Sequence, residues 1–404
     1  MSPAAVEVLR AIPAVGDFLA SAAGRELGER FGSGALKLEL RAVLEEHRNA
    51  ILKGRRGTAP SLAEVAGELE PQLTRLTQPG GRRAINATGI MLHTGLGRAP
   101  LCAAAITAMQ VAAGYTPLQA NLESGDRSLR EEKVQRLLQE LVGCEAATMV
   151  NNNAAATMLV LHTLAGGVGG SAGKEVIISR GQLIEIGGSF RMTDVMAQSG
   201  AVVREVGTTN RTHLRDYEGA INEKAGAIIH VHTSNYRIRG FTSTPEVGEL
   251  AVLARKYHLP LIADVGSGAL VPLSEYGISD EPLVKESLAA GGGADIACFS
   301  GDKLISGPQA GIICGKAAWI EKIRKSPYAR MFRVCKLTLA GLEATLLEFL
   351  NGTYRREIPF YRMLGRKIED LEVEARAVAE GVGGAAVPGV GVLCLNRNDT
   401  PLSQ

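Results

Sequence analysis

Residues 294–303 read ADIACFSGDK, a short apolar run that ends in a turn carrying Lys303. Similar runs precede it at residues 146–150, 175–179, 201–206, 227–233 and 260–265. Each run is nearly continuous in apolar residues instead of alternating, as in strands that are buried on both faces. Helical patterns lie between the runs. The sequence therefore predicts an α/β fold with a mostly parallel sheet and helical crossovers.

The first 75 residues carry a different pattern. Apolar residues recur at helical spacing in 5–20 and 35–52, and Pro60-Ser61 begins a further helical segment. We expect a small helical N-terminal domain over residues 1–75 and a large α/β domain over residues 76–335. Between the N-terminal helices lies the basic stretch KGRRG (53–57), which is either a solvated loop or a contact to a nucleic-acid backbone.

Composition excludes several classes of protein. The chain has 404 residues, of which 44 are Lys or Arg and 42 are Asp or Glu, so there is no overall positive charge that would indicate DNA binding. Its six cysteines form no CxxC pair, which argues against a disulfide framework or a zinc site, and we expect no metal. No apolar run is long enough for a membrane span or a signal peptide, so we predict a cytoplasmic protein.

Ligands of such sheets bind at the carboxyl ends of the strands, so the residues that follow each strand are informative. The run at 146–150 is followed by NNNAAA, residues 151–156. An Asn can cap a helix, the small Ala side chains let a ligand approach, and the free N–H groups of a helix start suit a phosphate. The alternative is an Asn-capped helix that binds nothing.

Two charged residues follow other strands of the predicted sheet. Asp264 lies at the tip of the run PLIADV (260–265), and Lys303 follows ADIACFS. Asp264 is either a turn or cap residue, or the counter-ion of a protonated ring nitrogen; Lys303 alone would be a surface residue. Together with the helix start they form the set that pyridoxal 5'-phosphate requires: a lysine for the Schiff base, a carboxylate for the pyridinium and a helix end for the phosphate.

The chain also resembles a known family, the bacterial L-seryl-tRNA(Sec) selenium transferases, or selenocysteine synthases. The resemblance runs from about residue 5 to 375. It is carried by INATGIMLHTGLGRAPL, VNNNAAA, SRGQLIEIGGSFR, EVGTTNRTHLRDYEGAI, HTSNYRIRGFT, ADVGSGAL, FSGDKLISGPQAGIICGK and LTLAGLEATL.

This resemblance implies a fold-type I, aminotransferase-like three-layer core that binds pyridoxal phosphate over residues 76–335. It further implies that the N-terminal domain binds tRNA and that the protein is a homo-oligomer, a ring of dimers expected to be a decamer. The family continues into a small C-terminal subdomain, whereas this chain ends at residue 404. We therefore expect residues 336–404 to contain a helix and an incomplete small subdomain.

The resemblance also assigns site residues. Lys303 is the Schiff-base lysine and acid/base, with Asp302 beside it, and Asp264 is the partner of the ring nitrogen. Asn152, Asn153 and Ala154 lie near the cofactor phosphate, and Ser300 belongs to the same cofactor site. Arg98, Arg330 and Arg333 bind selenophosphate or tRNA phosphates. Thr208 and Thr209 are similar to a loop that reaches the site of a neighbouring subunit.

The reaction implied is the conversion of seryl-tRNA(Sec) to selenocysteinyl-tRNA(Sec). Water is eliminated to give an aminoacrylyl intermediate, to which selenium is added from selenophosphate. Two alternatives remain: a related pyridoxal-dependent lyase that acts on a free amino acid or sugar acid, and a truncated homologue without catalytic activity.

Three internal positions depart from the family pattern. Gln182 stands where the family usually has Glu, residues 125–130 read GDRSLR where it has GERGSR, and Cys335 stands where Asp is common. We expect the loop at 125–130 to be shifted and Cys335 to be a buried substitution.

Overall fold

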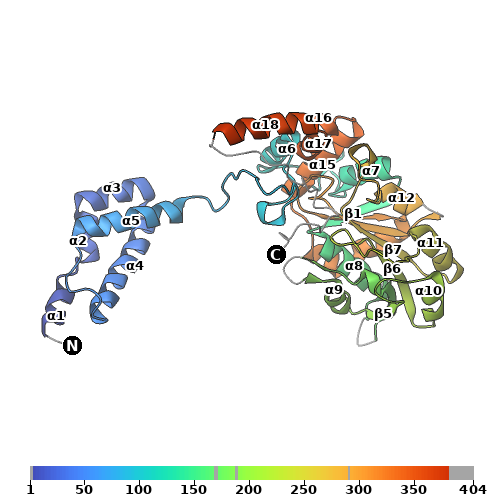
Figure 1. Cartoon of the computed structure of the whole chain (residues 1–404), viewed down its shortest axis with the longest axis horizontal. Helices are drawn as coiled ribbons and strands as arrows, with labels where there is room; N and C mark the ends of the chain where they lie inside the picture. The colour runs from blue at the N-terminus through green and yellow to red at the C-terminus, as the bar shows by residue number, and fades with distance from the viewer. Residues whose placement is uncertain (1–2, 168–171, 187–189, 290–291, 382–404) are drawn as a thin grey trace. The chain divides into compact units, whose positions relative to one another are not determined.

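The computed structural model describes residues 3–167, 172–186, 190–289 and 292–381 (Figure 1). It divides into two compact units, one of residues 1–85 and one that begins at Asn86. The part of the expected C-terminal subdomain that follows residue 381 lies outside the described residues.

The first unit is a bundle of short helices. Its core is made of fully buried apolar side chains, among them Phe18, Leu40 and Leu69. Ser61 caps the last helix by accepting a hydrogen bond from the Glu64 N–H at 3.2 Å, as the Pro60-Ser61 pair predicted. The helices are α1 (Pro3–Arg10), α2 (Val15–Ala20), α3 (Ala22–Phe31), α4 (Ser33–Leu52) and α5 (Leu62–Thr77).

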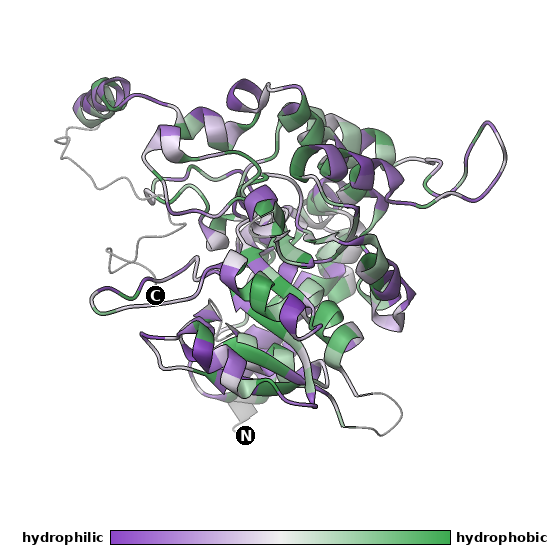
Figure 2. Cartoon of the chain, turned by 90° about the vertical axis from the view of Figure 1, so that its right-hand side faces the viewer, coloured by the Kyte–Doolittle hydropathy of each residue, from purple (hydrophilic) through white to green (hydrophobic). Residues whose placement is uncertain are grey.

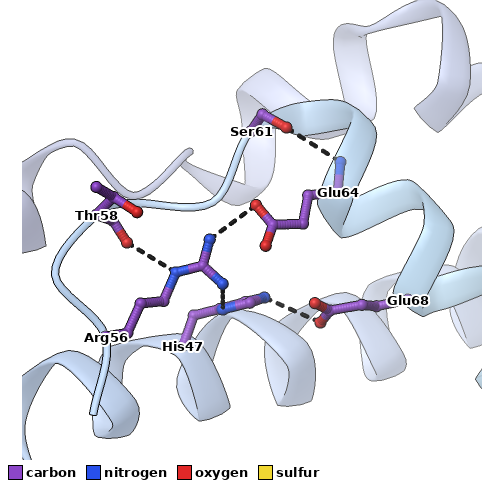
Figure 3. Close-up of polar contacts among 6 residues, drawn as sticks. All are labelled: His47, Arg56, Thr58, Ser61, Glu64 and Glu68. Carbon is purple, nitrogen blue, oxygen red and sulfur yellow. Dashed lines mark hydrogen bonds and ion pairs between the residues drawn. The ribbon is translucent and has the colours of Figure 1, made fainter.

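One arginine of the basic stretch at 53–57, Arg56, forms hydrogen bonds within the first unit (Figure 3). Arg56 donates from Nη2 to Glu64 at 2.7 Å, from Nε to the Thr58 carbonyl at 2.7 Å, and from Nη1 to His47 Nδ1 at 3.2 Å. The other ring nitrogen of His47 bonds to Glu68 at 2.9 Å. Arg56 therefore joins the loop to α4 and α5, while Lys53 and Arg55 remain exposed to solvent.

The second unit is built on a seven-stranded sheet in the order β1-β9-β8-β7-β6-β2-β5. The six predicted strands are confirmed, five of them parallel neighbours from β8 to β5. The sequence reading missed β9, which lies antiparallel between β1 and β8. The strands are β1 (Ala146–Val150), β2 (Glu175–Ser179), β5 (Val202–Val206), β6 (Ala225–Val231), β7 (Leu261–Gly266), β8 (Ile296–Ser300) and β9 (Gly311–Gly315). A separate hairpin pairs β3 (Glu185–Ile186) with β4 (Phe190–Arg191).

Helices cover both faces of this sheet, so the core has three layers. Alternate strand residues enter two different apolar clusters: Ile177 packs on one face, and Val176 and Ile178 pack on the other. Figure 2 shows hydrophobic strands enclosed by helices that also carry hydrophilic segments. One face holds α8 (Asn153–Ala165), α9 (Met192–Gln198) and α13 (Ala317–Lys325). The other holds α6 (Ala103–Ala112), α7 (Glu132–Val142), α10 (Leu214–Ala220), α11 (Val247–Lys256), α12 (Val284–Ala289) and α15 (Lys336–Leu350).

Short helices complete the second unit: α14 (Pro327–Met331), α16 (Tyr354–Glu357), α17 (Pro359–Leu364) and α18 (Ile368–Gly381). Single 3-10 turns lie at Thr94–Leu96, Arg180–Gln182 and Ser274–Tyr276. Among the helices of the described residues, none combines the length and the apolar character that a membrane-spanning segment needs.

Two leucines on α4 test the core of the first unit. Leu40 is fully buried, whereas Leu38 is 59% exposed. We predict that Leu40→Ala lowers the free energy of unfolding of this unit by about 2–5 kcal/mol, because it leaves a cavity. Leu38→Ala should change it by less than about 0.5 kcal/mol. Denaturant unfolding followed by circular dichroism measures both, and equal losses would contradict the packing described.

Candidate active site

The carboxylate of Asp264 is buried at the end of β7, with only 3% of the residue exposed. It accepts hydrogen bonds from Asn153 Nδ2 at 2.8 Å, from Thr157 Oγ1 at 3.0 Å and from the Gly266 N–H at 3.1 Å. Burial raises the pKa of Asp264, while these hydrogen bonds and the charge of Lys303 oppose that rise. Such a carboxylate is prepared to receive a cationic or N–H partner.

The start of α8 lies against this carboxylate. Asn152 caps the helix by accepting a hydrogen bond from the Ala155 N–H at 2.9 Å. The close approach requires glycine on the neighbouring strand, because a Cβ on Gly311 would lie 2.0 Å from the Asn152 carbonyl oxygen. The Asn153 side chain turns to Asp264, and its Oδ1 is buried without a hydrogen-bond partner among the described residues. The first N–H groups of the helix remain suited to an anion.

Lys303 follows β8 in a tightly bonded loop. Gly301 N–H donates to the Ala310 carbonyl at 2.8 Å, and Gly307 N–H donates to the Gly301 carbonyl at 2.9 Å. A Cβ on Gly301 would approach the Pro308 oxygen to 2.9 Å. Burial lowers the pKa of Lys303, Arg98 lowers it further, and nearby carboxylates oppose the shift. The loop thus fixes the backbone of a lysine whose pKa lies below its usual value.

Arg98 and Asp302 hold each other beside this lysine. Nη1 of Arg98 lies 3.0 Å from both carboxylate oxygens of Asp302. Arg98 has a positive φ of 63°, a backbone conformation that is uncommon outside glycine and is often found at functional sites. The structure therefore brings together Lys303, Asp302, Arg98 and Asp264, and it joins Arg98 to Asp302 in an ion pair.

Arg330 lies in the last turn of α14 and Arg333 follows this helix, in a segment that is attached to the end of β1. Asn151 N–H donates to the Phe332 carbonyl at 2.9 Å, and Val150 forms a bridge with Arg333. This attachment places the segment next to the start of α8. Both arginines are exposed.

Arg130, at the end of the GDRSLR loop, belongs to the same neighbourhood. Its Nη2 donates to the Val334 carbonyl at 3.0 Å. Burial, followed by the positive charge of Arg333, lowers the pKa of Arg130. The sequence did not single out Arg130. The expectation that ligands bind at the carboxyl ends of strands does not cover a loop that precedes a helix, as this loop precedes α7.

Thr208 and Thr209 are not brought to Lys303. They follow β5, the edge strand, in an exposed turn where the Thr208 N–H donates to the Arg211 carbonyl at 2.8 Å. β5 is four strands from β8, which corresponds to about 19 Å at the usual strand spacing.

The remaining predicted positions have varied surroundings. Ser300 ends β8 and is buried. Gln182 is also buried, and its Oε1 accepts a hydrogen bond from the Val231 N–H at 3.0 Å. The expectation that Cys335 is buried was wrong: it is exposed at the start of α15, with its Sγ 3.6 Å from Thr338 Oγ1.

Three residues near Asp264 were missed by the sequence reading. Thr157 donates to the Asp264 carboxylate, the His232 N–H donates to the Asp264 carbonyl at 2.9 Å, and Glu281 accepts a hydrogen bond from Ser267, which follows β7. His232 directly follows β6, so the rule that ligands bind at strand ends could have found it. Thr157 lies one helical turn into α8 and Glu281 lies in a loop, and neither position carries a signal in a single sequence.

Comparisons with known proteins show similarity to one family over most of the chain. The family model described as L-seryl-tRNA selenium transferase matches residues 84–393, and the model described as selenocysteine synthase N terminal matches residues 9–48. The L-seryl-tRNA(Sec) selenium transferase of Carboxydothermus hydrogenoformans is 42% identical over 95% of this chain and 80% of its own length. That of Methylocella silvestris is 46% identical over 94% and 80%.

Among solved structures, a D-glucosaminate-6-phosphate ammonia-lyase matches with a TM-score of 0.53 and 22% identity. The match covers 65% of this chain and 67% of that one. At this identity the likeness concerns the fold alone, and with the sheet described above it confirms the expected fold class.

Two threonines of α8 test the support of Asp264. Thr157 donates to the carboxylate, whereas Thr163 donates only to the Leu159 carbonyl of its own helix. We predict that Thr157→Val lowers the free energy of unfolding by about 1–3 kcal/mol at neutral pH, because the buried carboxylate loses a donor. Thr163→Val should cost less than about 1 kcal/mol.

The decrease in the free energy of unfolding caused by Thr157→Val should be smaller in mildly acidic solution. The hydrogen bond from Thr157 favours the charged form of Asp264, so its removal raises the pKa of Asp264 further. Once the carboxyl is protonated, the missing hydrogen bond costs less free energy of unfolding. Chemical denaturation at several pH values measures the difference. A loss that does not vary with pH would show that Thr157 supports packing only.

Proposed function

Because the chain belongs to the L-seryl-tRNA selenium transferase family, we propose that Lys303, Asp264 and the start of α8 form the catalytic centre of its reaction. That reaction converts seryl-tRNA(Sec) to selenocysteinyl-tRNA(Sec) with selenophosphate as the selenium donor, and pyridoxal phosphate is the cofactor. Family membership confirms the resemblance read from the sequence. It favours this reaction over that of a lyase for a free amino acid or sugar acid.

The observation that carries the assignment is the meeting of a lysine, a buried carboxylate and a helix start at one edge of the sheet. Lys303 would hold the cofactor aldehyde, Asp264 would accept the ring N–H, and the first turn of α8 near Asn152 and Ala154 would bind the phosphate. When bound, the cofactor stabilises the negative charge that develops at the seryl Cα. Oδ1 of Asn153, which has no hydrogen-bond partner within the described part of the chain, fits a site that is completed by a ligand.

Lys303 carries the proton transfers in this proposal. Its Nζ takes the proton from Cα and gives it to the departing hydroxyl, so that water leaves as the bond from Cβ to oxygen breaks. Selenium of selenophosphate then bonds to Cβ while its proton passes through Nζ to Cα, and water cleaves the bond from selenium to phosphorus and releases phosphate. A lowered pKa suits these steps, since the amine must be neutral before it can accept a proton.

The arginines form the oxyanion-binding part of the site. Arg330 and Arg333 lie on the segment attached to the end of β1 beside α8, and Arg98 lies beside Lys303. Guanidinium groups bind phosphate oxygens in pairs of hydrogen bonds, so this group suits selenophosphate. Asp302 orients Arg98 through their ion pair.

Two further proposals concern the tRNA and a neighbouring subunit. We propose that the first unit binds the tRNA, with exposed Lys53 and Arg55 as phosphate contacts and Arg56 as the residue that holds their loop. We further propose that Thr208 and Thr209 serve the site of a neighbouring subunit in a ring of dimers, since they lie far from Lys303 in their own chain. The place of action is the cytoplasm, where charged tRNA is used.

Replacement of Lys303 tests the proposed attachment of the cofactor. In Lys303→Ala we expect no visible absorption band with pyridoxal phosphate and no selenocysteinyl-tRNA, because the attachment point and the proton carrier are both lost. Lys285→Ala, which changes an exposed lysine of α12, should keep both. Absorption spectra and a tRNA-product assay measure the outcome. A band that persists in Lys303→Ala would overturn the assignment.

Replacement of the two exposed arginines tests the proposed binding of selenophosphate. Arg330→Ala and Arg333→Ala should each raise the KM for selenophosphate about 10–100-fold, the cost of a lost charge-assisted contact, while the cofactor band is kept. Arg362→Ala, an exposed arginine of α17, is the control. Steady-state kinetics with selenophosphate as the varied substrate measure this. A change in kcat alone would argue for a different role.

A further inference from the structure

A groove on the second unit collects positively charged side chains that the reaction above does not use. Its volume is about 470 Å³, within the range of ligand-binding clefts, and it lies between the end of α6, α7 with the loop before it, and the start of α15. Four cations and two carboxylates line it, so the groove has two positive charges in excess. These residues are Arg130, Glu132, Lys133, Arg136, Lys336 and Glu343.

Most of the positive charge in the groove is not neutralised by the protein. Lys133 pairs with Glu343 at 3.2 Å. Within the described part of the chain, no carboxylate forms an ion pair with the other three cations that line the groove. A cleft lined by an excess of one charge attracts ligands of the opposite charge. The groove is therefore suited to an anion.

Two of the cations are held in place by backbone carbonyls. Nζ of Lys336 donates to the Ala113 carbonyl at 3.2 Å and to the Gly114 carbonyl, at the end of α6. Arg130 donates from Nη2 to the Val334 carbonyl at 3.0 Å, and its Nε is buried without a hydrogen-bond partner among the described residues. Carbonyls orient these side chains but leave their charge unneutralised, and the free Nε indicates a missing acceptor.

The walls of the groove also suit a ligand larger than an inorganic anion. α15 contributes its first two turns, so the positive end of the helix dipole lies at the groove. Apolar side chains lie among the cations, and sugars or bases can pack on them. They are Pro117, Leu118, Leu129 and Leu339.

The groove is joined to the proposed oxyanion site. The contact of Arg130 is with Val334, which directly follows Arg333, and Lys336 is two residues further along the chain. The bridge between Arg333 and Val150 attaches the same segment to the end of β1, beside the start of α8. A ligand with several phosphates in a row could therefore contact the groove and the arginines together.

We propose that this groove binds the phosphodiester backbone of the unpaired 3′ end of the tRNA. The inference rests on the proposed function, in which the seryl group reaches Lys303 while it is esterified to the last ribose. The nucleotides before that ribose must cross the protein surface next to the site, and each of them carries a negative charge. Positively charged grooves bind single-stranded nucleic acid by following its backbone in this way.

The test compares Arg136→Ala with Arg215→Ala. Both arginines are exposed, but Arg215 lies on α10, which packs against β2 and β5 at the sheet edge opposite to β1. Filter binding at several salt concentrations measures the affinity for intact tRNA(Sec) and for the same tRNA without its unpaired 3′ nucleotides.

Arg136→Ala should weaken the binding of intact tRNA about threefold to tenfold. It should also reduce the slope of log affinity against log salt by about 0.7, the value for one lost contact to a single strand. The affinity of Arg136→Ala for the shortened tRNA should equal that of the wild type, because the shortened tRNA does not reach the groove. Arg215→Ala should bind both RNAs like the wild type.

A second arm uses the charge itself. Arg136→Lys keeps the charge and should stay within about twofold of the wild type, whereas Lys336→Gln removes another cation and should again weaken only the binding of intact tRNA. The KM for selenophosphate in Arg136→Ala should stay within about twofold of the wild type, in contrast to Arg330→Ala and Arg333→Ala. This comparison separates the phosphates of the tRNA from the free oxyanion.

Four results overturn the inference. They are wild-type affinity of Arg136→Ala for intact tRNA, equal weakening with intact and shortened tRNA, a raised KM for selenophosphate in Arg136→Ala, and a loss of self-association of this variant in light scattering. The third result would make the groove a site for the free oxyanion, and the fourth would make it an interface between copies of the chain.

A failure of the proposed function looks different. In that case the wild-type protein does not bind the tRNA, or its cofactor band does not depend on Lys303, and the groove loses its assignment as well. If the wild type binds the tRNA and forms the product while Arg136→Ala behaves like Arg215→Ala, only the role of the groove is lost.

Discussion

The site depends on one requirement, that the carboxylate of Asp264 be hydrogen-bonded where water cannot reach it. Two of its three donors, Asn153 and Thr157, come from α8, and the third comes from its own strand. β1, which leads into α8, is separated from β7 by β9 and β8. The helix must therefore cross to Asp264 over two strands. Gly311 at the start of β9 permits this, since a side chain there would collide with Asn152.

The same burial governs the charges of the site. Partners from distant parts of the chain hold its carboxylates: Asn153 and Thr157 donate to Asp264, and Arg98 pairs with Asp302. Burial raises the pKa of Asp264 and lowers that of Lys303, which moves both groups toward neutrality when no ligand is bound. A ligand that brings an N–H for the carboxylate and an aldehyde for the amine relieves both costs.

Sequence reasoning succeeded where local pattern and topology agree. The bounds of β1 and β2 were predicted to the residue, because each is an apolar run between polar turns. Asp264 and Lys303 were placed together because parallel strands end at one edge. The contact of Asn153 with Asp264 could not be predicted, since it joins residues 111 apart through the particular path of α8. Glu281 lies in a loop, and only the folded chain places its carboxylate near Ser267 and His232. The family resemblance supplied the arginines, which no spacing rule would have joined.

The strand that was missed, β9, explains why a lysine stands between glycine turns. A parallel strand would be followed by a helix, and Lys303 would then lie in an ordinary strand-to-helix turn. Instead the chain returns at once as antiparallel β9, and the loop from Gly301 to Ala310 is bonded to itself at Gly301, Ser306 and Gly307. The backbone of Lys303 is fixed by this return. In the proposed reaction Lys303 would hold the cofactor and carry protons, and a fixed backbone suits both tasks because it holds the amine in place.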